Sequence, residues 1–455
     1  MLKIIEHIEF HSQKHISYFE KVKGWESYFG DLKKEDVISI DSDREFVSIV
    51  LDKKNSEGEE DVTFSCQLKS SYFIGLDRFP NLGLNVHIVP KLNTNEQELN
   101  YVKLLLEALK EPDNFEHLDG LFTMKSNDEW LEIENSEQPL LPPFLLAQFL
   151  SVVKNLVKRG LKKSYYTKTE NLRNRVRGKI LVGVQIKQNI LKNRVVNTVC
   201  QYQEFGLDTE VNQFIKYVLF KTQNYLDDYA KDSELYKNLI GLVHYCKGGF
   251  QQVSDLRFTQ FTFKENNPFF RNYNHAIALG NQILKLEDYN IAKTSHVKTV
   301  KHPPFWIDMS KLFELYVFKK LRERFKEEGE VKYHFKVNRQ EPDFIIHEQQ
   351  ENGIKAIVDA KYKPRYKNGN PSMEDARQLA GYARLNSIYK ELGVDGKDII
   401  PCYFVYPAEL IVESESTEEE IDILEDGINK NILNGCTRQS TTYKEMYMQE
   451  IAIKT

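Results

Sequence analysis

The sequence predicts a multidomain α+β protein with a β-rich N-terminal domain (1–140), a mainly helical middle region (141–300) and a C-terminal α/β domain (301–455). Its 455 residues suffice for about three domains. Short apolar runs separated by turn residues dominate the first hundred positions, whereas apolar residues recur at helical spacing in the middle. Towards the C-terminus helical and strand patterns alternate, which is typical of helices packed on one central sheet.

The composition fits an ordinary soluble globular protein. Hydrophobic residues make up 41% of the chain and charged residues 28%, with a formal net charge of −5 and a mean hydropathy of −0.51. These values exclude a disordered or collagenous chain. No apolar run reaches the roughly 18 residues needed to cross a bilayer, and the first residues are too polar for a signal peptide. The five cysteines are scattered and never in CxxC spacing, so we expect a cytoplasmic protein without a membrane partner, disulfide framework or zinc ribbon.

The N-terminal region is expected to be a small β-rich domain or barrel. Residues 1–20 are expected to form a short helix. Strands are expected over residues 36–92, in the runs EFVSIVLD, DVTFSCQL, SYFIGLD and LNVHIVPKL. The segment NSEGEE at 55–60 predicts a hairpin turn, and the leucines of residues 96–110 indicate a helix after the strands.

The middle region is expected to be helical over residues 142–161, 207–245 and 272–290. The prolines at the start of the first helix stand where a missing N–H group costs little. Two prolines in KHPPFWID, residues 301–308, interrupt the helical pattern and indicate a domain boundary.

Residues 158–179 form a basic strip, which contains nine Lys and Arg residues, two tyrosines and a single acidic residue. Such a strip fits contacts with nucleic-acid phosphates, with Arg173, Arg175 and Arg177 as candidates. A solvated face and a contact with a protein partner are the alternatives.

The C-terminal region begins with an amphipathic helix over residues 310–328, in which four apolar residues recur every fourth position: Phe313, Val317, Leu321 and Phe325. Strands are then expected in VKYHFKV, DFIIHE and GIKAIVDAKYK. A helix over 373–392 and a strand over 398–408 complete the pattern. The acidic run 413–426 is expected to be a solvated loop or helix surface.

Two of these strands carry the residues that indicate chemistry. Asp343 opens one strand, and the next strand ends in Asp359-Ala360-Lys361. Alternate side chains of a strand share a face, so Asp359 and Lys361 point the same way, and a hairpin would place Asp343 beside Asp359. Converging carboxylates favour a divalent cation such as Mg²⁺. A lysine beside such a cation can orient a water molecule or stabilise charge on a phosphate, as in metal-assisted phosphodiester hydrolysis.

The Asp-x-Lys triplet by itself is a weak signal, because it also occurs at Asp31, Asp52 and Asp395. Only the pair at 342–361 has an apolar strand on the inner side of each acid. A turn-capping aspartate followed by a surface lysine is the alternative for the triplet alone. The next helix places Gln378 and Tyr382 four residues apart on one face.

The order helix-Glu, Pro-Asp, Asp-x-Lys and Gln-x-x-x-Tyr resembles the PD-(D/E)xK nuclease superfamily in its RecB-like branch. More specifically, the chain resembles McrC, the nuclease subunit of the McrBC modification-dependent restriction systems. The resemblance extends from about residue 70 to 385. Beside the acids and lysine it includes the segments SYFIG at 71–75, VPK at 89–91, RGKI at 177–180, LDTEVN at 207–212 and DMSKLFE at 308–314.

This resemblance implies a restriction-endonuclease-like fold for the C-terminal domain and a Mg²⁺-dependent deoxyribonuclease, with Mn²⁺ as an alternative metal. Asp343 and Asp359 would hold the metal, the Ala360 carbonyl would be a further ligand, and Glu314 would reach the metal through water. Lys361 would orient the attacking water or stabilise charge.

The resemblance also implies roles around this centre. Gln378 and Tyr382 would orient the site or touch DNA. Lys363, Arg365 and Lys367 follow the candidate catalytic lysine and would contact the DNA backbone. Ordinary surface or packing roles are the alternative for Glu314, Gln378 and Tyr382.

The partners implied are double-stranded DNA, methylated or otherwise modified, and a McrB-like AAA+ GTPase hexamer. The N-terminal part of the chain would dock on this motor and stimulate its GTPase. The sequence has no GxxxxGK[ST] segment, so we expect no nucleotide bound by this chain itself. Two alternatives remain: a stand-alone RecB-like repair nuclease, and a non-catalytic adaptor that activates an AAA+ motor.

Overall fold

The structure is a computed structural model. It describes residues 2–5, 9–11, 36–40, 47–55, 62–79, 84–93, 97–125, 130–134, 142–229, 236–291, 299–337, 340–350, 353–363, 371–408 and 437–453. The acidic run 413–426 and the candidate DNA contacts Arg365 and Lys367 lie outside these residues.

Two compact units make up the chain. Unit 1 combines Met1–Leu140 with His296–Thr455, and unit 2 is Leu141–Ser295. The sequence-based division separates the first and last of three domains, whereas the structure groups both in unit 1. Because a unit of this kind can hold more than one domain, the three-domain division stays a prediction.

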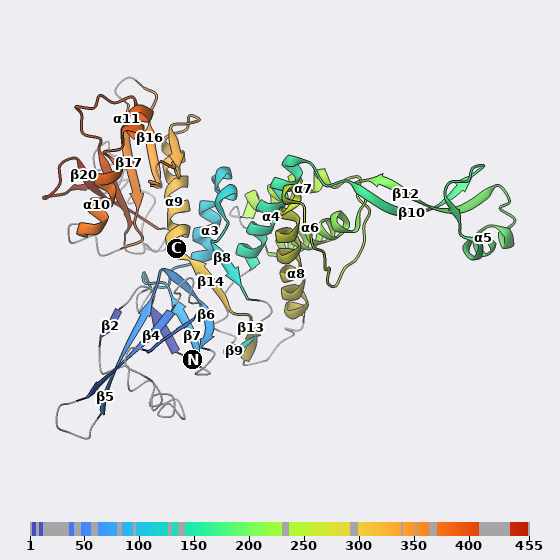
Figure 1. The fold of residues 1–455 in the computed structure, drawn as a ribbon, viewed down its shortest axis with the longest axis horizontal. Helices are drawn as coiled ribbons and strands as arrows, with labels where there is room; N and C mark the ends of the chain where they lie inside the picture. Colours follow the sequence, from blue (N-terminus) through green and yellow to red (C-terminus); the bar gives the residue numbers. More distant parts are fainter. Residues whose placement is uncertain are drawn as a thin grey trace. The chain divides into compact units, whose positions relative to one another are not determined.

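The first part of unit 1 consists mainly of short strands (Figure 1). The elements are β1 (Leu2–Ile5), β2 (Glu9–His11), β3 (Asp36–Ile40), β4 (Val47–Asn55), β5 (Val62–Ser70), β6 (Phe73–Phe79), β7 (Leu84–Val89), α3 (Tyr101–Ala108), β8 (Phe122–Met124) and β9 (Leu131–Glu134). The strands predicted between residues 36 and 92 are confirmed. The helix predicted for residues 1–20 is wrong at residues 2–5 and 9–11, which are extended in β1 and β2 and pair with β7 and β5. The other positions of that range lie outside the described residues.

A five-stranded sheet has the order β1-β7-β6-β14-β8. Its strand β14 (Phe305–Asp308) comes after unit 2 in the sequence and pairs antiparallel with both β6 and β8. Gly75 permits this close pairing, because a Cβ atom there would lie 2.1 Å from the carbonyl oxygen of Phe305. The glycine of the SYFIG segment is therefore required by the close approach of two strands. A second sheet has the order β2-β5-β4-β3, and β13 (Thr299–His302) pairs with β9.

The last part of unit 1 is built on a six-stranded sheet with the order β15-β16-β17-β18-β20-β19. Its strands are β15 (Val331–Tyr333), β16 (Phe344–His347), β17 (Lys355–Ala360), β18 (Cys402–Pro407), β19 (Thr437–Gln439) and β20 (Met446–Ile451). The first three are antiparallel neighbours, and β17, β18 and β20 run parallel. The helices are α9 (Met309–Arg324), α10 (Met373–Tyr382) and α11 (Asn386–Leu392), so the single helix predicted over 373–392 is two helices.

Alternate residues of β16 show how these helices cover the sheet. Phe344 stacks on Phe318 of α9, with ring centroids 6.0 Å apart. Its neighbour Ile345 belongs instead to a buried cluster that contains Leu379 of α10 and Leu392 of α11. Since successive side chains of a strand point to opposite faces, α9 packs on one face of the sheet, and α10 and α11 pack on the other.

In its described residues, unit 2 contains four long helices and a β-hairpin. Its elements are α4 (Pro142–Arg159), β10 (Ser164–Arg173), β11 (Lys179–Ile180), α5 (Val182–Gln188), β12 (Asn197–Gly206), α6 (Glu210–Tyr229), α7 (Lys237–Gly249) and α8 (Asn272–Ile291). The helices predicted in this region are confirmed. The hairpin of β10 and β12, absent from the sequence-based expectation, extends away from the helices of unit 2 and carries α5 near its end (Figure 1). We call residues 164–206 the arm.

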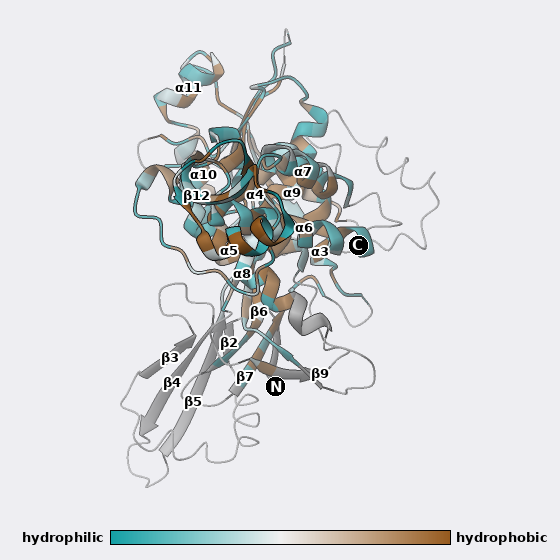
Figure 2. Ribbon diagram, turned by 90° about the vertical axis from the view of Figure 1, so that its right-hand side faces the viewer, coloured by the Kyte–Doolittle hydropathy of each residue, from teal (hydrophilic) through white to brown (hydrophobic). Residues whose placement is uncertain are grey.

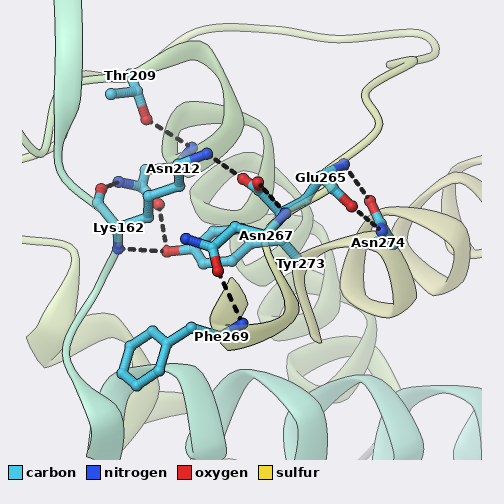
Figure 3. Close-up of polar contacts among 8 residues, drawn as sticks. All are labelled: Lys162, Thr209, Asn212, Glu265, Asn267, Phe269, Tyr273 and Asn274. Carbon is cyan, nitrogen blue, oxygen red and sulfur yellow. Dashed lines mark hydrogen bonds and ion pairs between the residues drawn. The ribbon is translucent and has the colours of Figure 1, made fainter. Parts of the chain in front are cut away.

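The base of the arm is held by one buried amide (Figure 3). The Asn212 side chain donates to the carbonyl oxygen of Lys162, 3.0 Å away, and to that of Leu207, 2.8 Å away. It also accepts a hydrogen bond from the Tyr273 hydroxyl at 2.9 Å, and that hydroxyl accepts from the Lys162 N–H group at 2.8 Å. Asn212 thus ties both ends of the hairpin to α6 and α8, and it gives the asparagine of the LDTEVN segment a structural role.

The RGKI segment has a steric explanation at the far end of the arm. Gly178 has a φ of +68°, and a Cβ atom there would lie 2.4 Å from the carbonyl oxygen of Gln201. Only glycine meets both conditions without strain. The neighbouring Arg177 guanidinium lies over the Tyr202 ring, 4.1 Å from its centroid. In the part of the chain that the structure describes, no helix is long and apolar enough to span a bilayer.

Candidate active site

Asp343 and Asp359 meet at the end of the β16–β17 hairpin. The register pairs Phe344 with Val358, so the next step along both chains sets Asp343 opposite Asp359. The backbone N–H group of Ala360 donates to Oδ2 of Asp343 at 2.8 Å. Asp359 is only 2% exposed, whereas Asp343 is half-buried. The hairpin predicted from the sequence therefore brings the two acids together.

Lys361 extends this cluster towards α10. Its Nζ atom lies 2.7 Å from Oδ2 of Asp359 and donates to Oε1 of Gln378 at 3.4 Å. The Gln378 amide in turn donates to the Tyr382 hydroxyl at 2.8 Å. Gln378 and Tyr382 stand four residues apart on α10, as their spacing predicts. The acids, the lysine and the Gln-x-x-x-Tyr pair thus form one continuous polar chain.

The carboxylates of the cluster repel one another, so a nearby positive charge stabilises their ionised forms. Burial raises the pKa of Asp343 well above its ordinary value, and the carboxylates of Asp359 and Glu314 raise it further, against the opposing effect of Lys361. Burial also raises the pKa of Asp359, although Lys361 opposes this shift. Burial lowers the pKa of Lys361, but the acidic neighbours outweigh it and leave that pKa raised. Lys361 is therefore a protonated cation at neutral pH.

Glu314 acts on both aspartates electrostatically, and its carboxylate also lies against a residue that the sequence analysis did not single out. Nε2 of His334 lies 2.9 Å from Oε1 of Glu314, and Nδ1 lies 3.0 Å from Oε1 of Glu341. His334 has a φ of +53° and donates its backbone N–H group to the Asp343 carbonyl at 2.9 Å. The sequence analysis placed His334 inside the strand VKYHFKV, but β15 ends at Tyr333, so the histidine stands in the loop before β16. No sequence signal marked it as part of the site.

The predicted DNA contacts have different surroundings. Lys363 donates to both carboxylate oxygens of Asp375, at 3.0 and 2.7 Å, and its side chain is only 13% exposed. Arg173, Arg175 and Arg177 are exposed on the arm in unit 2. Contact of any of these residues with DNA stays a prediction.

The donor set suits a hard divalent cation with few protein ligands. Within the described residues, no three His, Cys, Asp or Glu side chains lie close enough together to hold a metal ion. The two carboxylates that meet here, those of Asp343 and Asp359, are the candidate donors, and the Ala360 carbonyl stays a predicted ligand. Mg²⁺ commonly takes one or two carboxylates and keeps several waters, so these oxygen donors fit it. The raised pKa values of both acids are the expected mark of a carboxylate pair that a cation would relieve.

Comparison with known proteins identifies a class of restriction-system proteins. The chain belongs to the family of McrBC 5-methylcytosine restriction system components, whose model matches residues 68–392. This confirms the family predicted from the sequence segments. No curated protein matches the chain.

Two solved structures are similar to the chain at low identity. One is a refined half-complex from the tetradecameric assembly of Thermococcus gammatolerans McrB AAA+ hexamers with bound McrC, with 15% identity, a TM-score of 0.36, and coverage of 100% of this chain and 94% of that chain. The other is the cryo-EM structure of the Thermococcus gammatolerans McrBC complex, with 15% identity, a TM-score of 0.25, and coverage of 72% of this chain and 88% of that chain.

Proposed function

We propose that this chain is the Mg²⁺-dependent DNA endonuclease subunit of a McrBC-like restriction system that protects against phage. Its C-terminal sheet would be a PD-(D/E)xK nuclease fold, and a McrB-like AAA+ GTPase hexamer would activate it. The observation that carries the proposal is the cluster of Asp343, Asp359 and Lys361 at the end of one hairpin. Family membership gives independent support for a role in restriction.

The metal would be held by Asp343, Asp359 and the Ala360 carbonyl, and when bound it would activate a water molecule and neutralise charge on the scissile phosphate. Lys361 acts as a protonated cation, because the acids beside it raise its pKa. With this charge Lys361 would orient the attacking water or stabilise negative charge on the phosphate by a charge-assisted hydrogen bond. Gln378 orients the ammonium group, since its Oε1 atom accepts from Nζ of Lys361.

We propose that the arm also meets the motor, in addition to the N-terminal part that the sequence analysis expects to dock on it. Large apolar side chains lie exposed along it, and they include Val176, Val182, Ile190, Leu191, Val195 and Phe205. Figure 2 shows much of α5 in the hydrophobic colour. Exposed apolar groups gathered on one projecting element favour a protein contact. Contact with DNA phosphates through Arg173, Arg175 and Arg177 is the competing use of the same element.

The test is cleavage of modified plasmid DNA with Mg²⁺, with and without a McrB-like motor and GTP. We expect cleavage only with the motor, none when EDTA removes the metal, and none for Asp359→Ala. Asp395→Ala is the matched control, because Asp395 heads an exposed Asp-x-Lys triplet in the same unit.

Other outcomes point to the alternatives. Cleavage without the motor would favour a stand-alone nuclease. Absence of cleavage in every mixture, with motor GTPase stimulated equally by wild type and Asp359→Ala, would favour the non-catalytic adaptor.

A further inference from the structure

The ammonium group of Lys91 lies against two aromatic rings, and one ring belongs to the residue directly after Lys361. Nζ of Lys91 is buried, 4.0 Å from the centroid of the Tyr362 ring and 4.9 Å from that of the Tyr72 ring. An ammonium group is attracted to the face of an aromatic ring, and the attraction grows when water is excluded. Lys91 therefore links Tyr362 to the N-terminal part of unit 1.

Tyr362 is an anchor of the backbone that presents Lys361. Its side chain is only 2% exposed, and its ring centroid lies 5.8 Å from that of Phe313 on α9. The Lys361 N–H group donates to the Val405 carbonyl at 2.7 Å, and this bond fixes the backbone on the other side. The position of the Tyr362 ring thus helps to set where the Lys361 ammonium group stands relative to Asp359.

Lys91 and Tyr72, whose ring Lys91 also contacts, come from two segments of the family resemblance that have no proposed role at the metal site. Lys91 ends the VPK segment after β7, and Tyr72 belongs to the SYFIG segment at the start of β6. Strands β6 and β7 are antiparallel neighbours in the five-stranded sheet. The two segments therefore converge on Tyr362 from one end of a hairpin.

We propose that Lys91 is a positioning residue for DNA cleavage, which acts by holding the Tyr362 ring and so fixing Lys361 against Asp359. The proposal rests on the nuclease function proposed above. Displacement of a catalytic group by about 1 Å can slow a reaction on the order of a hundredfold. Loss of the Lys91 cation would therefore lower the rate of the chemical step while leaving DNA binding in place.

The test compares Lys91→Met, which keeps the length of the side chain without its charge, with Lys91→Arg, which keeps a cation able to bind aromatic faces. Motor-activated cleavage, the KM for DNA, the stimulation of motor GTPase and thermal unfolding are measured for each. We expect Lys91→Met to lower kcat by about ten- to a hundredfold with KM, GTPase stimulation and melting temperature nearly unchanged. We expect Lys91→Arg to recover most of kcat. Lys301→Met, at an exposed lysine of β13, is the matched control.

Three results would overturn the proposal. The first is wild-type kcat in Lys91→Met. The second is a folded Lys91→Met variant that loses cleavage and GTPase stimulation to the same extent, since that indicates a general structural role. The third is a wild-type chain that never cleaves, which refutes the nuclease function itself and is recognised before any variant is compared.

A second pair of variants decides the matter if Lys91→Met does not fold. Tyr362→Phe keeps the ring and is expected to cleave within about threefold of wild type, whereas Tyr362→Leu removes the face that Lys91 contacts and is expected to lose kcat as Lys91→Met would. Equal kcat in these two variants would refute a role for the ring.

Discussion

The backbone N–H group of Ala360 donates to Oδ2 of Asp343 across the end of the β16–β17 hairpin, at 2.8 Å. This bond fixes one acid against the strand that carries the other. It also means that Asp343 is held by main chain, so its position does not depend on the conformation of another side chain. The arrangement destabilises the charged form of Asp343, because its carboxylate shares a poorly solvated region with those of Asp359 and Glu314.

The first prediction follows from this destabilisation. Asp343→Asn should abolish cleavage and yet raise the thermal stability of the metal-free protein, because it removes one of several repelling, buried carboxylates. An increase of about 1 kcal/mol corresponds to roughly 2–4 °C in melting temperature for a domain of 150–250 residues. Thermal unfolding in EDTA measures the effect. A variant that is less stable than wild type at pH 7 would contradict this account of the cluster.

The difference in stability between Asp343→Asn and the wild-type protein is expected to depend on pH. The folded-state pKa of Asp343 is raised, so the folded protein binds this proton more tightly than the unfolded chain does. The contribution of Asp343 to stability is therefore fully present below the unfolded pKa and is lost as pH rises through the folded pKa. The stability advantage of Asp343→Asn should accordingly shrink as the pH falls from neutral towards the unfolded pKa of about 4. Melting curves of both proteins across this range, in EDTA, provide the measurement.

The second prediction is a loss of stability, whereas the first is a gain. Lys361→Met should abolish cleavage and destabilise the metal-free protein by about 3 kcal/mol, because it leaves the buried Asp359 carboxylate without its cation. Lys397→Met removes the lysine of an exposed Asp-x-Lys triplet and should change stability by less than about 0.5 kcal/mol. Urea unfolding of the two variants gives the comparison. Equal stabilities would mean that the Lys361–Asp359 pair contributes nothing to the fold.

The helix and strands around this cluster could be predicted from the sequence, because the spacing of their apolar residues matches the residues that are buried in the structure. The stripe of α9 is fully buried, and β16 and β17 are continuous apolar runs bounded by polar turns. The break between α10 and α11 was not predicted. Gly381 stands near the end of α10, but Ala383, Arg384 and Leu385 between the two helices are good helix formers and continue the helical pattern. Strands β19 and β20 were missed since they follow a long acidic segment, and the apolar β20 pairs with β18 far away in the sequence.

The arm and the N-terminus contain two further strands, β10 and β1, that were not predicted from the sequence. The sequence of β10 is mostly polar and its side chains alternate between half-exposed and exposed, so it lacks the apolar alternation that indicates a strand. It was interpreted instead as a basic strip. Residues 1–20 have apolar positions compatible with a helix, but β1 is extended because it pairs with β7, a tertiary contact that local pattern does not contain. His334 was missed because no motif spacing links it to Glu314 on α9 or to Glu341 in its own loop.

The third prediction concerns the base of the arm. Asn212→Ala should destabilise unit 2 by about 2–4 kcal/mol, because it leaves the carbonyls of Lys162 and Leu207 and the Tyr273 hydroxyl without their shared partner. Tyr273→Phe removes only one hydroxyl group and should cost less, about 1–2 kcal/mol. Chemical denaturation monitors both. The reverse order of the two losses would show that Tyr273, rather than Asn212, secures the hairpin.

The fourth prediction separates the two uses proposed for the arm. Leu191 and Val195 are 74% and 84% exposed, so Leu191→Asp and Val195→Asp should change the free energy of unfolding by less than about 0.5 kcal/mol. If the arm docks on a motor, both should abolish stimulation of the motor GTPase, because a buried unpaired carboxylate in an apolar interface is costly. Ile399→Asp, at a residue 49% exposed in unit 1, should leave stimulation unchanged. Full stimulation by both arm variants, with weaker and less salt-dependent DNA binding in Arg173→Glu and Arg175→Glu, would assign the arm to DNA instead.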